Sequence, residues 1–220
     1  MEATRNIPSI EAGTSKMSTY LRYGVVSIRK LVQKALIHGS VYLNELIWRD
    51  FFSQILIHFP HSQNECFKKQ YSALSWSNDQ NLFEKWCGAQ TGFPFVDAGM
   101  QELNTTGLMH NRLRMVTAGF LCKNLLIDWR WGEAYFAQKL LDYDLASNVG
   151  NWQWAAGTGC DAAPYFRIFN PITQQKNFDP ENLYTEKQLK NTISSNTLPI
   201  VDLSESRLKA LAAYKKALLL

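Results

Sequence analysis

The chain has 220 residues, of which 46% are hydrophobic and 13% aromatic, and a formal net charge of +4. A chain of this length and apolar content can bury one sizeable core, which predicts a single domain that is ordered except at its ends. The 23 basic side chains exceed the 19 acidic ones by a small margin. This balance fits a nucleic-acid partner but also fits many proteins that have none.

Cysteine spacing and hydropathy indicate where the protein works. The cysteines lie far apart and form no C-x-x-C pair, at Cys66, Cys87, Cys122 and Cys160. Such spacing predicts neither a disulfide framework nor a metal site. No apolar run approaches the roughly twenty residues of a membrane span, and the N-terminus does not resemble a signal peptide. We therefore expect a cytoplasmic protein with no metal and no membrane partner.

Helical periodicity dominates the chain, without an internal repeat or a long alternating strand pattern. Residues 1–13 mix Pro, Ser, Glu and Gly and are expected to be coil. Helices are expected over residues 41–59, 82–89 and 132–141, from residues 97 and 111, and from about residue 205 to the end. The sequence thus predicts an all-α fold.

Residues 13–18, Gly-Thr-Ser-Lys-Met-Ser, precede an apolar pattern that begins at Tyr20. Their hydroxyl groups are expected to cap the free amides at the start of a helix. A helix start also attracts phosphate, because its unpaired N–H groups and its dipole favour negative charge. From these six residues alone, capping is the simpler interpretation.

The predicted helix over residues 41–59 has one ordinary apolar face and one mixed face. The mixed face collects Tyr42, Glu45, Trp48, Arg49 and Phe52. Glu45 and Arg49 are four residues apart, which predicts an ion pair worth a few tenths of a kcal/mol. An indole beside a carboxylate is also what a pocket for a stacked, hydrogen-bonded base requires.

Residues 107–116 place Asn111, Arg112 and Arg114 at the predicted start of another helix. Asn111 can act as a cap. The helix dipole disfavours cations at this end unless an anion is bound, so the arginines indicate a phosphate ligand.

Residues 142–161 are rich in Gly, Asn and Asp and also carry Trp152 and Trp154. We expect this segment to interrupt the preceding helix and to form a buried, irregular backbone. Buried backbone groups need partners, which predicts that a polar ligand satisfies some of them.

Several of these stretches resemble the flavin-binding core of DNA photolyases and cryptochromes. They are Gly13–Ser18, Gly107–Val116, Asp142-Tyr-Asp144, Asn148, Gly150-Asn-Trp-Gln-Trp154 and Asp161-Ala-Ala-Pro-Tyr-Phe-Arg-Ile-Phe-Asn-Pro171. The motifs match that family in order and spacing from about Ile10 to Lys176, closest to the photolyases for cyclobutane pyrimidine dimers. The resemblance implies a helical FAD-binding and catalytic domain over residues 14–180, with a surface segment and helix of the same domain over residues 181–220.

The resemblance implies FAD as the cofactor and assigns its binding residues. The diphosphate is expected at Thr14, Ser15, Lys16, Met17 and Ser18. The remaining cofactor contacts are expected from Tyr42, from an Arg114–Asp142 ion pair beside the isoalloxazine, from Tyr143 and Asp144, and from Asn148 facing flavin N5. An amide at position 148 does not titrate, so it can bind a reduced flavin without changing charge. This favours repair over signalling.

The same resemblance implies light-driven repair of a pyrimidine dimer that is flipped out of DNA. Polar contacts to the lesion are expected from Glu45, Asn111 and Arg112, apolar walls from Trp48 and Trp154, and contacts to the DNA backbone from Arg49 and Gln174. Relatives that repair the 6-4 photoproduct typically have a His-His pair near position 111, so Asn111 favours the cyclobutane dimer.

Trp76, Trp129 and Trp152 match the family's chain of tryptophans, through which a surface reductant refills an oxidised flavin. Core packing would explain any one of them equally well. Their register with the other motifs favours electron transfer.

Two alternatives remain open from the sequence. One is a cryptochrome, a flavoprotein that signals in blue light without repairing DNA. The other is a fragment or inactive remnant, because the α/β antenna domain that precedes this region in the family is absent. A cavity open along one side would lose ligand contacts, so either a separate chain supplies the missing N-terminal half or FAD binding is weak.

Overall fold

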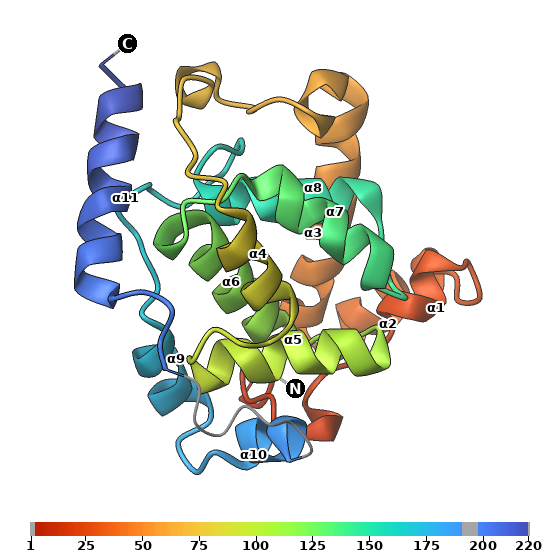
Figure 1. Cartoon of the computed structure of the whole chain (residues 1–220). Helices are drawn as coiled ribbons and strands as arrows, with labels where there is room; N and C mark the ends of the chain where they lie inside the picture. Colours follow the sequence, from red (N-terminus) through yellow and green to blue (C-terminus); the bar gives the residue numbers. More distant parts are fainter. Residues whose placement is uncertain (1–2, 191–197, 220) are drawn as a thin grey trace.

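The computed structural model describes residues 3–190 and 198–219, and all regular elements in this part of the chain are helical (Figure 1). The all-α prediction is confirmed. The α-helices are α1 Ser18–Arg22, α2 Ile28–His38, α3 Ser40–His58, α4 Gln80–Cys87, α5 Pro94–Thr106, α6 Asn111–Gly119, α7 Trp129–Lys139, α8 Leu145–Ala156, α9 Pro171–Phe178, α10 Leu183–Leu189 and α11 Leu203–Ala217. Short 3-10 turns lie at Glu11–Gly13, Pro60–Gln63 and Lys69–Tyr71, and a π-helical turn at Phe120–Asn124 follows α6.

Helices α3, α4 and α11 lie close to where periodicity places them. Helix α3 ends before Pro60, which cannot continue a helix. Helices α4 and α11 begin after Asp79 and Asp202, whose carboxylates accept backbone N–H groups of the first turn. Helix α7 begins three residues earlier than predicted, because Asp128 caps it by accepting from Arg130 N at 3.0 Å.

Helices α4 to α8 surround one aromatic core, whose largest fully buried side chains include Trp86, Trp129 and Phe136. Helix α10 lies against α5, and α11 runs along one edge of the molecule (Figure 1). Helix α11 is joined to the π-helical turn by a hydrogen bond from Asn124 Nδ2 to Ser206 Oγ, 3.0 Å long. No described helix is both long enough and apolar enough to cross a membrane.

Residues 145–156 form a regular helix, so the prediction of an irregular backbone across residues 142–161 is wrong for most of this segment. Asp144 caps α8 by accepting from Ser147 N at 2.9 Å. Gly150 allows α8 to pack tightly on α3, because a Cβ there would lie 2.1 Å from the Phe52 ring. The residues that indicated a loop therefore serve capping and close helix packing.

The hydroxyl cap predicted before Tyr20 is also not formed. Helix α1 has five residues and begins after Met17 without a side-chain cap. Ser15 Oγ instead accepts from Met17 N at 3.4 Å within the preceding loop. A dipole argument for phosphate binding therefore does not apply to this short helix, and any anion site here depends on the loop itself.

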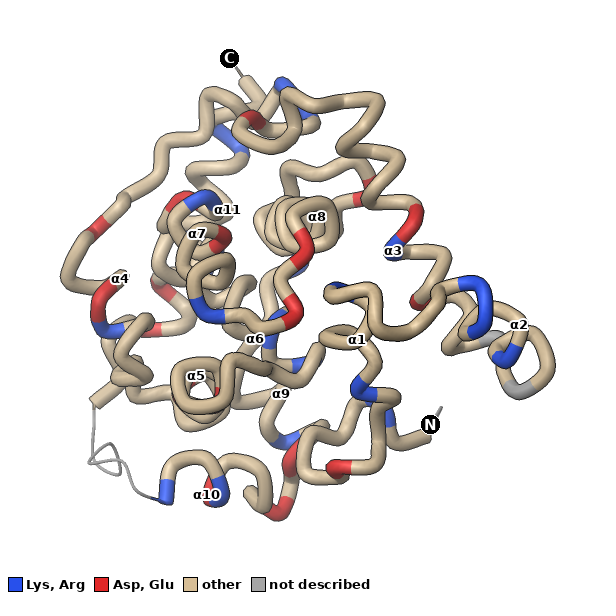
Figure 2. Tube along the Cα trace, turned by 90° about the vertical axis from the view of Figure 1, so that its right-hand side faces the viewer, with Lys and Arg blue, Asp and Glu red and all other residues tan. Residues whose placement is uncertain are grey.

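Helix α2 carries basic residues and no acidic ones (Figure 2). Residues 18–38 contain four basic and no acidic side chains, and Arg29, Lys30 and Lys34 are exposed on α2. This group of exposed basic residues on α2 fits a polyanionic partner.

A buried lysine ties the end of α8 to neighbouring segments. Lys123 is 2% exposed, and its Nζ donates to Ala156 O at 2.8 Å and to Tyr165 O at 3.3 Å. It also lies 3.7 Å from the centre of the Tyr214 ring of α11. Burial lowers the pKa of Lys123 to about 7.

We expect Gly150→Ala to lower the free energy of unfolding by about 1–3 kcal/mol, because the new methyl group would overlap Phe52. Gly119→Ala is the matched control, since a Cβ there meets Phe169 at an ordinary 3.5 Å. The control should change stability by no more than about 1 kcal/mol. Urea unfolding of both variants tests this, and equal stabilities would contradict the packing described.

Lys123 should make stability depend on pH. Between about pH 7 and 10.5 the folded lysine is neutral while the unfolded one is charged. The unfolded chain then binds more protons, so the free energy of unfolding rises with pH by at most about 1.4 kcal/mol per pH unit. Below pH 7 both states are charged, and this contribution is constant.

In the Lys123→Met variant, the free energy of unfolding should no longer show this rise with pH. Urea unfolding at pH 7, 8 and 9 gives the free energy of unfolding of the natural chain and of the variant. Their difference at each pH isolates Lys123, because the other titrating groups contribute equally to both proteins. A difference that does not change with pH would show that the lysine titrates normally.

Candidate functional site

The predicted motifs meet around three adjoining hollows in the described part of the chain. The first, of about 330 Å³, lies between residues 13–18, α3 and α6. The second, of about 110 Å³, lies between α6, α7 and α8, and the third, of about 270 Å³, between α3, α6 and α8. Asn111 lines all three, so the hollows adjoin at the start of α6.

The loop over residues 13–18 forms one wall of the first hollow. Gly13 leaves no space for a side chain, since a Cβ would lie 2.9 Å from Thr4 O. The N–H groups of Thr14, Ser15 and Lys16 have no acceptor among the described residues. Across the hollow, the buried hydroxyl of Tyr42 also lacks a partner. Free donors beside a lysine favour a ligand with negatively charged acceptor oxygens.

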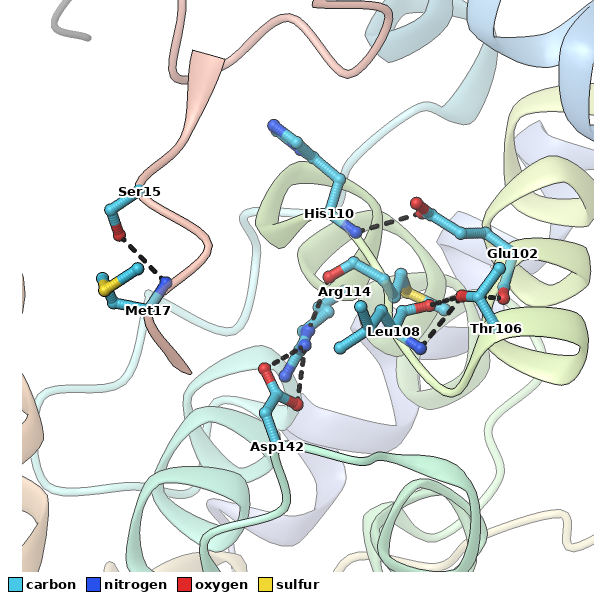
Figure 3. Close-up of polar contacts among 9 residues, drawn as sticks. Ser15, Met17, Glu102, Thr106, Leu108, His110, Arg114 and Asp142 are labelled. Carbon is cyan, nitrogen blue, oxygen red and sulfur yellow. Dashed lines mark hydrogen bonds and ion pairs between the residues drawn. The ribbon is translucent and has the colours of Figure 1, made fainter. Parts of the chain in front are cut away.

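Arg114 and Asp142 form the predicted ion pair between the first and second hollows (Figure 3). Arg114 donates through one terminal nitrogen to Asp142 Oδ1 at 3.0 Å and to Oδ2 at 2.8 Å. Its Nε donates to Met109 O at 2.9 Å. The Asp142 side chain is 4% exposed, so the pair is held in a fixed position at a partly buried site.

His110 supplies the cap of α6 that the sequence analysis assigned to Asn111. Its Nδ1 accepts from Arg112 N at 3.1 Å, while its own backbone N–H donates to Glu102 Oε2 at 3.1 Å (Figure 3). Burial, with the charge of Arg112 as a second cause, lowers the pKa of His110 to about 4. Because Nδ1 is an acceptor, the neutral ring carries its proton on Nε2. Asn111 is thereby left exposed at the hollows.

Hydrogen bonds to Glu133 orient the side chain of Asn148, which lines the second hollow. Its Nδ2 donates to Glu133 Oε1 at 3.0 Å and to the Glu133 carbonyl at 3.3 Å. The Tyr143 hydroxyl donates to the same Oε1 at 3.2 Å, and burial raises the pKa of Tyr143 to about 12, so it remains a donor. Because Glu133 occupies the amide nitrogen, Asn148 Oδ1 is the atom left for a ligand. The second hollow thus offers an acceptor to an N–H group.

The third hollow brings together Glu45, Trp48, Asn111 and Trp154. The Trp48 ring is stacked on Phe52 at 5.9 Å and meets Phe51 edge-on at 5.2 Å, but the residue remains 44% exposed. Aromatic walls from α3 and α8 beside polar groups suit a flat heterocycle.

Glu45 does not form the predicted ion pair with Arg49. Its Oε1 instead lies 2.6 Å from a terminal nitrogen of Arg5, in the N-terminal segment. Arg49 remains half-buried and lines the third hollow. The pairing differs because Arg5, in a segment expected to be coil, reaches Glu45 of α3.

Some residues that the resemblance assigned to the site lie outside the hollows. Arg112 donates to Asn6 Oδ1 at 2.7 Å and lies 4.0 Å from the centre of the Phe178 ring. Gln174 has a buried, unpartnered Oε1 but lines none of the hollows. Trp129 lies in the aromatic core, and Trp76 packs against that core. Trp152 lines the second hollow.

Sequence reasoning missed Arg5, Met115, Ser147 and Asn151, which also line the hollows. Ser147, Asn151 and Trp154 are spaced by four and three residues, which places them on one face of α8. Treating this segment as a helix would have found them. Nothing in the composition of residues 1–13 marks Arg5. The described residues contain no group of three or more side chains suited to holding a metal ion.

Comparison with known proteins gives a consistent picture. A family model described as the FAD binding domain of DNA photolyase matches residues 42–196. The deoxyribodipyrimidine photo-lyase of Vibrio cholerae is 50% identical over 80% of this chain and 39% of its own length. That of Escherichia coli is 42% identical over 98% of this chain and 52% of its own length.

Solved structures agree. An archaeal photolyase from Sulfolobus tokodaii, described with two FAD molecules, superposes with a TM-score of 0.91 at 38% identity, covering 98% of this chain and 53% of that one. A Synechocystis cryptochrome superposes with a TM-score of 0.87 at 34% identity, covering 96% of this chain and 51% of that one. This chain thus spans about half the length of most of these relatives.

Removing one charge of the Arg114–Asp142 pair should destabilise the fold. We expect Asp142→Asn to lower the free energy of unfolding by about 1–3 kcal/mol, because Arg114 loses one of its two oxygen acceptors and its paired charge at a partly buried site. Asp144→Asn is the control, since asparagine caps a helix as well as aspartate does. Equal losses in urea unfolding would mean that the ion pair does not hold the site.

Proposed function

Because the chain belongs to the family of FAD-binding domains of DNA photolyases, we propose that it binds FAD and repairs cyclobutane pyrimidine dimers in DNA by light-driven electron transfer. The observation that carries this proposal is the assembly of Glu45, Trp48, Asn111 and Trp154 around one hollow that adjoins two others lined by the expected cofactor residues.

The first and second hollows fit the two ends of FAD. The diphosphate would bind the free N–H groups of residues 14–16, with Lys16 and the hydroxyls of Thr14, Ser15 and Ser18. The flavin ring would lie along Asp142, Tyr143, Asp144 and Asn148, with Asn148 Oδ1 as an acceptor for a ring N–H. Bound reduced FAD supplies light absorption and the electron, while the protein orients it.

The third hollow fits a pair of joined pyrimidines. Trp48 and Trp154 would form apolar walls, and Glu45 and Asn111 would contact the polar edges of the bases. Glu45 would have to exchange its ion pair with Arg5 for the lesion. Arg49 and the exposed basic residues of α2 would attract the DNA backbone.

Arg112 and Gln174 have a weaker geometric basis. A contact from Arg112 to the lesion would require it to leave Asn6 and Phe178. For Gln174, the unpartnered Oε1 leaves one acceptor free.

We also propose that a further polypeptide segment, in the same or a separate chain, completes the cavity. The chain matches about half the length of its photolyase relatives, and Tyr23, Val25 and Ile37 expose more than half of their surface near α1 and α2. Free cysteines fit a reducing, cytoplasmic setting.

A blue-light signalling flavoprotein is the second candidate, favoured by the similarity to the Synechocystis cryptochrome. It would bind FAD in the same hollows but would not split dimers. The third hollow argues against this candidate, because signalling does not require a site for a pyrimidine pair.

The test has two stages. The purified chain is mixed with FAD and gel-filtered, and we expect flavin absorption to elute with the protein. The reduced, illuminated complex should then restore thymine pairs in an oligonucleotide that carries one dimer. Flavin binding without repair would favour the signalling candidate, and failure to bind flavin both alone and with a relative's N-terminal half would overturn the proposal.

Trp48→Ala should weaken binding of the dimer-containing oligonucleotide about tenfold or more, because the stacking wall is lost. Ile57→Ala, an exposed position on the same helix away from the hollows, is the control. Fluorescence titration measures both affinities, and equal affinities would contradict the assignment of the third hollow.

A further inference from the structure

An irregular segment over residues 161–169, here called the rim segment, borders the third hollow. Asp161 lines this hollow, and the ring of Phe169 lies 6.3 Å from that of Trp154, one of the two aromatic walls. The rim segment contains no helix or strand. Its backbone N–H groups bond to nearby carbonyls, as Arg167 N does at 2.8 Å to the residue three positions earlier. Such a segment depends on side chains from other elements for its position.

Lys123, in the π-helical turn, joins the rim segment to the end of α8. Its buried Nζ donates to Tyr165 O at 3.3 Å and to Ala156 O, the last residue of α8, at 2.8 Å. Between these two carbonyls the chain turns at Gly157, which has a positive φ of 87°. A Cβ on Gly157 would lie 3.1 Å from Nζ and 3.6 Å from Tyr165 Cα. Glycine therefore leaves the space through which one amine reaches both carbonyls.

Tyr214 of α11 supplies a second link to the same residue. Its ring is stacked on the ring of Tyr165, with centres 5.8 Å apart and an interplanar angle of 4°. Its buried hydroxyl donates to Ala156 O, the carbonyl that also accepts from Lys123. Lys123 and Tyr214 thus hold both the backbone and the ring of Tyr165, and they fix its position relative to α8.

Packing alone does not explain a lysine in this place. Burying an amine costs free energy, and a methionine of similar length would fill the space without that cost. What the lysine adds is two hydrogen bonds in set directions, one on each side of the turn at Gly157. Its contribution is therefore the geometry of the turn and of the rim segment that follows.

We propose that Lys123 and Tyr214 are positioning residues for recognition of the pyrimidine dimer, because they hold the rim segment at the edge of the third hollow. This inference rests on the proposed function, which assigns the dimer to that hollow. Neither side chain lines any of the three hollows, so both act through Tyr165 and not by touching a ligand.

Release of the rim segment should weaken dimer binding and leave flavin binding unchanged. A segment that samples several conformations must be ordered when DNA binds, and the cost of ordering is subtracted from the affinity. FAD is assigned to the first two hollows, which the rim segment does not line. A general loss of stability would instead weaken the binding of both ligands.

The test compares FAD-loaded variants that remove one link at a time. Lys123→Met removes the two donors, Tyr214→Leu removes the stacked ring, and Tyr214→Phe keeps that ring. We expect the first two to bind a dimer-containing oligonucleotide about fivefold more weakly or worse. Tyr214→Phe and the control Lys209→Met, at an exposed position of α11, should stay close to the natural chain. Flavin fluorescence titration should give the same FAD affinity for every variant.

Limited trypsin digestion reads the rim segment without flavin or DNA. Arg167 is exposed in this segment and offers a cleavage site. Cleavage after Arg167 should be about tenfold faster or more in Lys123→Met than in Lys209→Met, because the released segment opens more often.

The two readouts together decide between the roles. Circular dichroism confirms folding, and Lys123→Met decides alone if Tyr214→Leu does not fold. Unchanged dimer affinity in Lys123→Met, with or without faster cleavage, would overturn the positioning role. Parallel losses of flavin and dimer affinity would overturn it as well. Failure of the natural chain to bind the dimer would instead overturn the proposed function, and this inference with it.

Discussion

Close packing of α8 against its neighbours is the constraint on which the site depends. Gly150 brings α8 against Phe52 of α3, and Gly132 of α7 lies so close to Trp152 that a Cβ there would be 2.1 Å from the indole ring. Helix α8 carries Asn148, Trp152 and Trp154, so these two contacts set the separation of the walls around the second and third hollows. Larger residues at either glycine would move every one of those side chains together.

The groups around the hollows are neutral or paired with an opposite charge, which limits the free-energy cost of binding a charged ligand there. Arg114 is matched by Asp142 and Glu45 by Arg5, while His110 is held neutral by burial. Asn148 adds an uncharged acceptor that is fixed by Glu133. A site built in this way can accept an anionic cofactor at the loop and a neutral heterocycle beside α8 without leaving an unpaired buried charge.

The fold was predictable wherever a helix carried its own start and stop signals. Pro60, Asp79 and Asp202 mark such ends, and α3, α4 and α11 lie close to their expected positions. Composition misled the interpretation of α8, because Gly150 is needed for tertiary packing that periodicity along one segment does not reveal. The walls of the third hollow, Trp48 and Trp154, were identified through family resemblance. The ion pair between Arg5 and Glu45 joins positions forty residues apart and leaves no local signal.

A crystal structure of the chain with FAD and an oligonucleotide containing a thymine dimer tests the central claim most directly. The account predicts FAD density that runs from Thr14–Ser18 to Asn148, with the dimer between Trp48 and Trp154. Density for either ligand on an unrelated surface, with these three hollows unfilled, would contradict it.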